Sequence, residues 1–203
     1  MSAVQLIAMA STVSFLAGWR LYFVTFVIGL GMRLGWLPLP DQLHALDVLA
    51  NVWIIGIAAV GAVAEFFADK IPWLDSAWDA VHTFVRPIGG ALLSMPIING
   101  SDPAWQVGSL LLGGSAAFLA HVGKSGTRTL INVSPEPYSN IALSSGEDLT
   151  AAGLLALAIN FPIAAAAIAV VLLLLSLWLV IAARRALRFV ANKIGRRPAE
   201  HSR

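Results

Sequence analysis

The stretch from Gly113 to Asp148, GGSAAFLAHVGKSGTRTLINVSPEPYSNIALSSGED, decides how this chain is interpreted. It begins as an apolar helix, becomes rich in Gly, Ser and Thr, and carries His121, Lys124 and Arg128. Ionisable residues between hydrophobic segments are costly in a bilayer and are therefore functional candidates. The stretch predicts the chemical centre of a membrane protein. A solvated loop is the alternative, because its Ser-Pro-Glu-Pro run is also typical of turns.

The composition around this stretch indicates an integral membrane protein. Hydrophobic residues make up 58% of the 203 and charged residues only 12%, whereas soluble domains carry about 25% charged residues. At about 20 residues per span, we expect an all-α integral membrane protein of about four to five transmembrane helices plus one re-entrant or interfacial helical segment. Cysteine is absent, which excludes disulfides, thiolate catalysis and cysteine-ligated metals.

The basic residues are concentrated at the C-terminus. We divide the chain into a single transmembrane bundle, residues 1–183, and a basic tail, residues 184–203. Positive charge beside a span favours the cytoplasmic side, so we expect a multi-pass protein of the bacterial cytoplasmic (inner) membrane with a cytoplasmic C-terminus. Nucleic-acid binding is not expected, because the tail adjoins a span and offers only Phe189 for base stacking.

The first hydrophobic segment, residues 4–34, contains Arg20 directly after Gly18 and Trp19. It predicts either one long tilted helix or two pieces that meet near Gly18. We expect Arg20 to extend to the membrane interface; inside the bundle it would need an acidic or phosphate partner. The last hydrophobic run, residues 149–183, is too long for one crossing, and Asn160-Phe161-Pro162 predicts a kink or break within it.

The middle of the chain shows helical spacing of polar residues. Asp75, Asp79, His82 and Arg86 share one face of a helix. Residues 75–99 are the expected re-entrant or interfacial segment, which would place both chain ends in the cytoplasm. Residues 64–69 and 116–121 echo each other in sequence, and in this topology they would be antiparallel, as in an inverted repeat.

Two segments resemble a known family: AEFFADKIPWLDSAWDAVHTFVRP at residues 64–87 and HVGKSGTRTLINVSPEPYSNIALSSGED at residues 121–148. Both are similar to the signature of the domain of unknown function 4126 family, small bacterial integral membrane proteins without an assigned activity. The resemblance implies a membrane location and assigns no catalytic or binding residue.

Cationic side chains are the leading candidates for a ligand site. Arg forms a planar fork that fits phosphate or carboxylate, while Lys supplies a compact charge. Glycines and hydroxyl residues around Lys124 predict an anion-cradling nest of backbone N–H groups. Pairing of the cations with the chain's own carboxylates is the alternative. The candidate ligand-binding residues are Lys70, Arg86, Lys124, Arg128, Glu136 and Asn140.

Acidic residues and histidines support two further hypotheses. Intramembrane carboxylates and histidines serve as proton relays or ion-pair members, and here they are Glu65, Asp69, His82 and His121. Asp75, Asp79 and His82 have ligand types that suit a divalent metal. No cofactor is expected, and a divalent metal is the alternative.

These patterns favour a transporter or a lipid-handling protein over an enzyme. The ligand would be an anionic lipid or a small organic anion bearing phosphate or carboxylate. A metal-dependent membrane enzyme acting on a lipid headgroup and a non-catalytic structural or assembly subunit are the alternatives. The expected partners are membrane lipids, and the sequence allows an oligomer.

Overall fold

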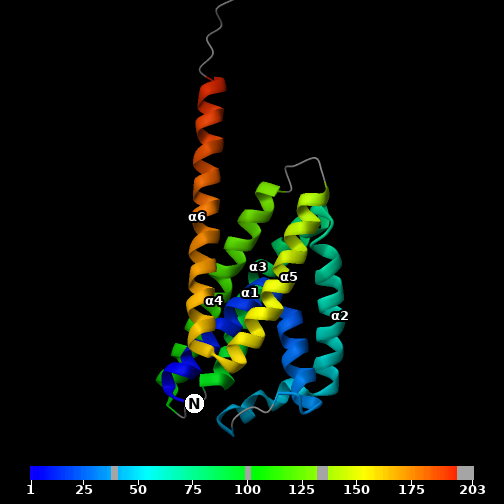
Figure 1. Ribbon diagram of the computed structural model, residues 1–203, viewed down its shortest axis with the longest axis vertical. Coiled ribbons are helices and arrows are strands. Elements are labelled where there is room, and N and C mark those ends of the chain that lie inside the picture. Colours follow the sequence, from blue (N-terminus) through cyan, green and yellow to red (C-terminus); the bar gives the residue numbers. More distant parts are fainter. Residues whose placement is uncertain (38–40, 99–101, 132–136, 196–203) are drawn as a thin grey trace, which may run out of the picture.

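The computed structural model describes residues 1–37, 41–98, 102–131 and 137–195, and all of its regular elements are helical (Figure 1). The elements are α1 (Ala3–Arg33), the 3-10 segment η1 (Asp41–Ala50), α2 (Val52–Ala68), α3 (Pro72–Ile98), α4 (Pro103–Ile131), α5 (Pro137–Asn160) and α6 (Pro162–Gly195). In these ranges five helices are long and apolar enough to cross a membrane, and α2 is a shorter apolar helix of 17 residues. The predicted all-α membrane protein is confirmed.

Helix α1 is broken in its middle. The backbone leaves the helical conformation at Arg20, with φ −143° and ψ 65°. Figure 1 shows both arms of α1, dark blue before the break and lighter blue after it, running to the same lower end of the bundle. At that end Gly29 packs against Leu49 of η1. The break predicted near Gly18 is therefore present, and it makes α1 a re-entrant element.

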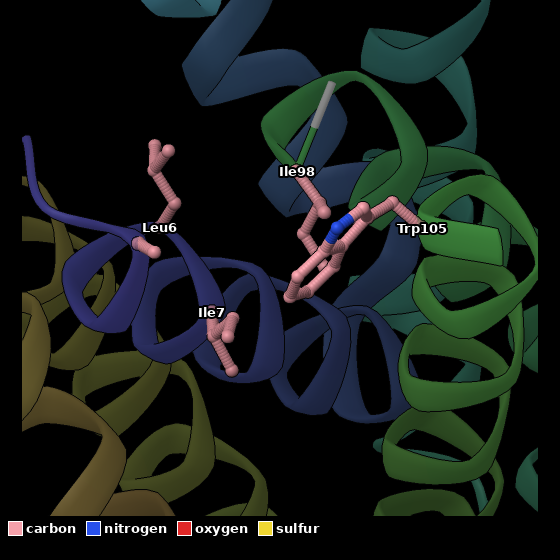
Figure 2. Close-up of a pocket in the computed structure, with 5 residues that line it drawn as sticks. Leu6, Ile7, Ile98 and Trp105 are labelled. Atoms are coloured by element: carbon pink, nitrogen blue, oxygen red, sulfur yellow. The ribbon is translucent and has the colours of Figure 1, made fainter. Parts of the chain in front are cut away.

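The first turns of α1 lie at the same end as the last turn of α3 and the first turn of α4. Figure 2 shows Trp105 extending from α4 toward Ile98 of α3, beside the turns that carry Leu6 and Ile7. These residues line an apolar pocket of about 140 Å³. The N-terminal arm is thus anchored among apolar side chains at the lower end.

Helices α2 to α6 run alternately up and down the long axis (Figure 1). The described part of the predicted re-entrant segment 75–99, residues 75–98, instead belongs to α3, which runs the length of the bundle despite Pro87 and Pro96. Neighbouring helices can supply partners for the backbone groups that proline frees, so a packed membrane helix tolerates it. Helices α2 and α4 run in the same direction, whereas an inverted repeat needs them antiparallel. The N-terminus and the end of α6 lie at opposite ends, contrary to the expected topology.

Small residues let α1 break against α4. A Cβ atom at Gly18 would collide with the carbonyl oxygen of Ala117 and lie 2.7 Å from the Cβ of Ala120. Only glycine fits at such a backbone approach. The break predicted at residues 160–162 is also confirmed: α5 ends at Asn160 and α6 begins at Pro162, so the long apolar run is a helical hairpin.

The distribution of polarity is inverted relative to a soluble protein. Large apolar side chains are exposed along the outer faces of α2, α3 and α6, as at Trp53, Phe84 and Trp178. Several charged side chains are buried, among them Arg20, Arg86 and Arg128 at 2% exposure or less. An apolar exterior faces lipid readily, whereas buried ions need partners inside the protein.

Candidate functional site

The buried ions gather around the break in α1 as one charge cluster. Its members come from α1 to α5 and from the turn between α2 and α3. The cluster consists of Arg20, Lys70, Arg86, Lys124 and Arg128 together with Glu65, Asp69, Asp75, Asp79, Glu147 and Asp148.

Asp69 is the hub of one half of the cluster. Its carboxylate forms an ion pair with Arg20 and accepts hydrogen bonds from Lys124 Nζ at 2.7 Å and Arg128 Nη2 at 3.3 Å. Burial raises the pKa of this carboxyl, but Lys124, Arg20 and Arg128 outweigh it and hold the pKa below the usual range. Lys124 also donates to the carbonyl oxygen of Trp19 at 3.0 Å. The cluster therefore binds the backbone at the break in α1.

Arg20 lies inside this cluster, so its predicted extension to the membrane interface is wrong. It contacts Asp148 at 2.8 Å and donates to the carbonyl oxygen of Ser144 at 3.3 Å. Lys70 completes this side: its Nζ lies 3.5 Å from Asp148 Oδ2 and 3.2 Å from the Ser144 hydroxyl. Burial lowers the pKa of Lys70, and the Asp148 carboxylate opposes that shift. The break places Arg20 among these acceptors, which removes the cost of burying it alone.

Arg86 is the hub of the other half. Its Nη2 donates to Glu65 Oε1 at 2.9 Å, and its Nη1 lies 3.1 Å from Asp79 Oδ1 and 2.8 Å from His121 Nδ1. Its partners lie in three helices: Glu65 in α2, Asp79 in α3 and His121 in α4. Arg86 therefore joins these three helices. Thr83 lies beside this group, with its Oγ1 3.1 Å from His121 Nε2.

His82 lies apart from these ion pairs. Its Nδ1 is 2.7 Å from the carbonyl oxygen of Trp78, and its Nε2 is 3.1 Å from the hydroxyl of Tyr22. The imidazole also stacks on Trp78, with ring centroids 4.3 Å apart. His82 is thus held on its own helix and against α1 through neutral groups.

A partly open polar cavity of about 180 Å³ adjoins the cluster. It is lined by Asp75, Ser76, Asp79, Ala80, Thr83, Ser125 and Arg128. These residues belong to the first turns of α3 and the last turns of α4, which lie at the upper end of the bundle, where α6 also ends (Figure 1). The cavity gives the cluster a route toward that end.

The predicted ligand-binding residues meet only in part. Lys70, Arg86, Lys124 and Arg128 converge in the cluster, where each contacts a carboxylate of the chain. Glu136 and the side chain of Asn140 lie outside the described residues. The predicted backbone nest around Lys124 is wrong, because these residues lie within α4 and their backbone is helical. Gly123 and Gly126 instead allow close packing against Ser176 and Val180 of α6.

The predicted relay residues Glu65, Asp69 and His121 lie in the cluster or in contact with it, whereas His82 contacts Tyr22. In the described ranges, no group of three or more His, Asp or Glu side chains is arranged to hold a metal ion, and this includes Asp75, Asp79 and His82. Glu147, Asp148 and Arg20 were not among the residues that the sequence predicted for the site, although a buried Arg20 with an acidic partner was one of the two alternatives for that residue. Two features of the sequence could have indicated them: Glu147 and Asp148 are adjacent acidic residues before an apolar run, and Arg20 is a basic residue within an apolar segment, directly after Gly18-Trp19.

Cluster geometry of this kind, in a bundle of apolar helices, defines a multi-pass membrane protein with a buried ionic centre. The model of the family described as "Domain of unknown function (DUF4126)" matches residues 7–182, so the chain belongs to this family. No curated protein and no solved structure matches the chain.

Proposed function

We propose that this chain is a small membrane carrier whose charge cluster binds the transported species. The observation that carries the proposal is the cluster itself, buried at the break of a re-entrant helix in a bundle with an apolar exterior. Buried ions are a poor source of stability, since apolar side chains of similar volume often stabilise as well or better. Broken helices with charged residues near their break are the way that transporters build binding sites within a membrane.

The balance of charge decides how an anionic ligand binds. Within the described residues the cluster has five basic and six acidic side chains, so its formal charge is −1 when all are ionised and the histidines are neutral. A phosphate or carboxylate arriving alone would add negative charge to a poorly solvated interior. Charged groups are costly there unless they are neutralised. We therefore propose that the anion binds together with protons, which makes the carrier proton-coupled.

Among the described residues, a polar cavity gives the cluster an approach from one end. The cavity beside Asp79 and Arg128 leads toward the upper end of the bundle. Toward the lower end the two arms of α1 pack apolar side chains under the cluster, including Val13, Leu16 and Val24, all with no exposed surface. An occluded site with access from one end is one state of an alternating-access cycle. Arg184 and Arg185 are exposed near the end of α6, so we propose that this end faces the cytoplasm.

A solute fits this arrangement better than a lipid does. An apolar groove of about 300 Å³ lies between the N-terminal arm of α1 and helices α4 and α6. Its lining, from Val4 to Leu173, contains no charged side chain. A lipid in this groove would not bring its headgroup to the cluster by way of the polar cavity. Asp79 and His82 are engaged by Arg86, Trp78 and Tyr22, so no observation favours the metal-dependent enzyme.

The test is uptake by proteoliposomes. Radiolabelled inorganic phosphate and small mono- and dicarboxylates are supplied outside, with and without an inward proton gradient. We expect acid-stimulated uptake of at least one probe by the parent chain and its loss in Arg86→Gln. Arg33→Gln is the matched control, because Arg33 is exposed and donates to the carbonyl oxygen of Ala50, away from the cluster.

A second variant guards against misfolding. Arg86→Gln leaves Glu65 and Asp79 without their cation, whereas the double variant Arg86→Gln with Glu65→Gln keeps the formal charge of the cluster. We expect the double variant to fold and not to transport. Native mass spectrometry of the gently purified parent chain provides the second readout. No uptake of any probe together with no bound lipid or anion would contradict the carrier function and favour a structural subunit.

A further inference from the structure

The contact between Arg86 and His121 fixes the protonation state of the histidine. A guanidinium group has only donors, so His121 Nδ1, 2.8 Å from Arg86 Nη1, accepts through its lone pair. The proton of the neutral ring is then on Nε2, which donates to Thr83 Oγ1 at 3.1 Å. Thr83 donates in turn to the carbonyl oxygen of Asp79 at 2.9 Å. These bonds run in one direction and define His121 as neutral with its proton on Nε2.

His82 carries its proton on the opposite nitrogen. A backbone carbonyl only accepts, so His82 Nδ1, 2.7 Å from the carbonyl oxygen of Trp78, bears the proton. Its Nε2 faces the hydroxyl of Tyr22 at 3.1 Å, a group that can donate or accept. A second proton on His82 therefore leaves the contact with Trp78 intact. A second proton on His121 must go to Nδ1 and must break the hydrogen bond with Arg86.

Resting on the carrier function proposed above, we propose that His121 is the binding site of the coupled proton and that protonation releases Arg86. A hydronium ion in the cavity gives its proton to Nδ1, where a new N–H bond forms, and a water molecule is left behind. The hydrogen bond from Arg86 Nη1 to Nδ1 is lost. Arg86 keeps its contacts with Asp79 and Glu65, and its freed N–H donor becomes available to an anionic ligand.

Asp79 gives the proton its path. Its side chain lines the cavity and lies 3.1 Å from Arg86 Nη1, the same nitrogen that faces His121 Nδ1. Thr83 also borders the cavity and touches the other side of the imidazole. The proton therefore reaches His121 without crossing the apolar core below the cluster. The uptake of one proton changes the formal charge of the cluster and its histidine from −1 to zero.

The charged groups around His121 explain why protonation of this histidine releases Arg86. Arg86 from α3 and Lys124 from its own helix oppose a positive ring, and Arg20 from α1 adds to the positive side of the cluster. Asp79 from α3 and Glu65 from α2 favour the positive ring. Lys124 is held by Asp69 and Trp19, so Arg86 is the cation next to His121 that a proton displaces.

Nitrogen-15 NMR of the histidine-labelled protein in bilayers tests the proton site without any transport assay. The chain has four histidines, and His121→Asn and His82→Asn assign the two signals of interest. At neutral pH we expect opposite neutral tautomers, with the proton on Nε2 in His121 and on Nδ1 in His82. On acidification we expect both ring nitrogens of His121 to carry protons. An arginine side-chain signal should shift over the same pH range, because Arg86 loses its hydrogen bond to His121. A proton on Nδ1 of neutral His121, or protonation with no arginine shift, would overturn the proposal.

Flux measurements test the coupling. His121→Asn places an amide oxygen near the position of Nδ1, so Arg86 keeps an acceptor but no proton can bind. We expect this variant to lose acid-stimulated uptake of the probe anion and to retain exchange of that anion at equal pH on both sides. His82→Asn, the matched control, should retain both. Unchanged acid stimulation in His121→Asn would overturn His121 as the proton site and would leave the carrier function intact. Absence of all flux in the parent chain would contradict the carrier function, whereas the NMR measurement of His121 protonation does not depend on flux.

Discussion

Substitution of Asp69 by Asn removes the charge at the hub of the cluster with little change of volume. In the parent chain the Asp69 carboxylate contacts Arg20, Lys124 and Arg128. The amide of Asn can still accept a hydrogen bond, but it carries no negative charge. Lys124 would then lack its only charged contact seen within the described residues, while Arg20 and Arg128 would keep Asp148 and Glu147.

The expected loss of stability follows from the burial of these groups. Asp69 and Lys124 have no exposed side-chain surface, and Arg128 has 1%. Removing one partner of a buried ion pair costs about 3–5 kcal/mol, because the other charge stays buried without compensation. At about 1.4 kcal/mol per tenfold change, this corresponds to a folding equilibrium weakened roughly 150-fold to 5,000-fold.

Asp148→Asn is the matched control, because Asp148 also contacts Arg20 but its side chain is 30% exposed. Water screens such a pair, so we expect a loss below about 1 kcal/mol. Reversible unfolding in mixed micelles by titration with denaturing detergent, followed by circular dichroism, measures both variants. A loss for Asp69→Asn within 1 kcal/mol of the loss for Asp148→Asn would refute the view of Asp69 as the hub.

Three further results are expected. Asp69 has a lowered pKa in the folded state, so its stabilisation is present at neutral pH and is lost only as the pH falls through that lowered value. The difference in unfolding free energy between the parent and Asp69→Asn should therefore stay constant down to about pH 4, the ordinary carboxyl range, and a difference that disappears by pH 6 would contradict this. Gly18→Ala should cost about 1–3 kcal/mol, since its new methyl group meets Ala117 and Ala120, whereas Gly56→Ala, with open space around it, should be neutral or slightly stabilising; equal effects in the same unfolding assay would argue against the close packing at the break. Trp36 follows the end of α1 and Tyr138 lies in the first turn of α5; both are exposed, and these two helix ends lie at opposite ends of the bundle. Single cysteines at these positions should react with a membrane-impermeant thiol reagent from opposite sides, and labelling of both from one side would refute the crossings between them.

The membrane class and the helical breaks follow from local chemistry, and for this reason the sequence predicts them. Low charge content indicates a membrane protein, and Asn160-Phe161-Pro162 marks the boundary between α5 and α6. Pro87 and Pro96, in contrast, lie within α3 without ending it. The break near Gly18 was one of two alternatives, and its consequence was not foreseen. Whether two arms of a helix continue or turn back depends on contacts with distant residues such as Ala117, which local sequence does not report.

Convergence of the candidate cations was only partly predictable. The sequence singles out Arg86, Lys124 and Arg128 because ions between apolar segments are rare. It does not show that Asp69 and Glu147 meet them, because these carboxylates come from a turn and a helix far along the chain. Helical spacing of Asp75, Asp79 and His82 indicated a shared face, but their partners lie on other helices. Tertiary contacts, and not the spacing of residues in the sequence, therefore determine which charged side chains pair with one another.

Proton movement across proteoliposome membranes tests the carrier account most directly. A pH-sensitive dye inside the vesicles reports acidification when the transported anion is added outside, for the parent chain and for His121→Asn at equal incorporation. The account predicts anion-dependent acidification in the parent and none in His121→Asn, which still exchanges the labelled anion. Equal acidification by both chains, or none by a folded parent chain that takes up the anion, would contradict it.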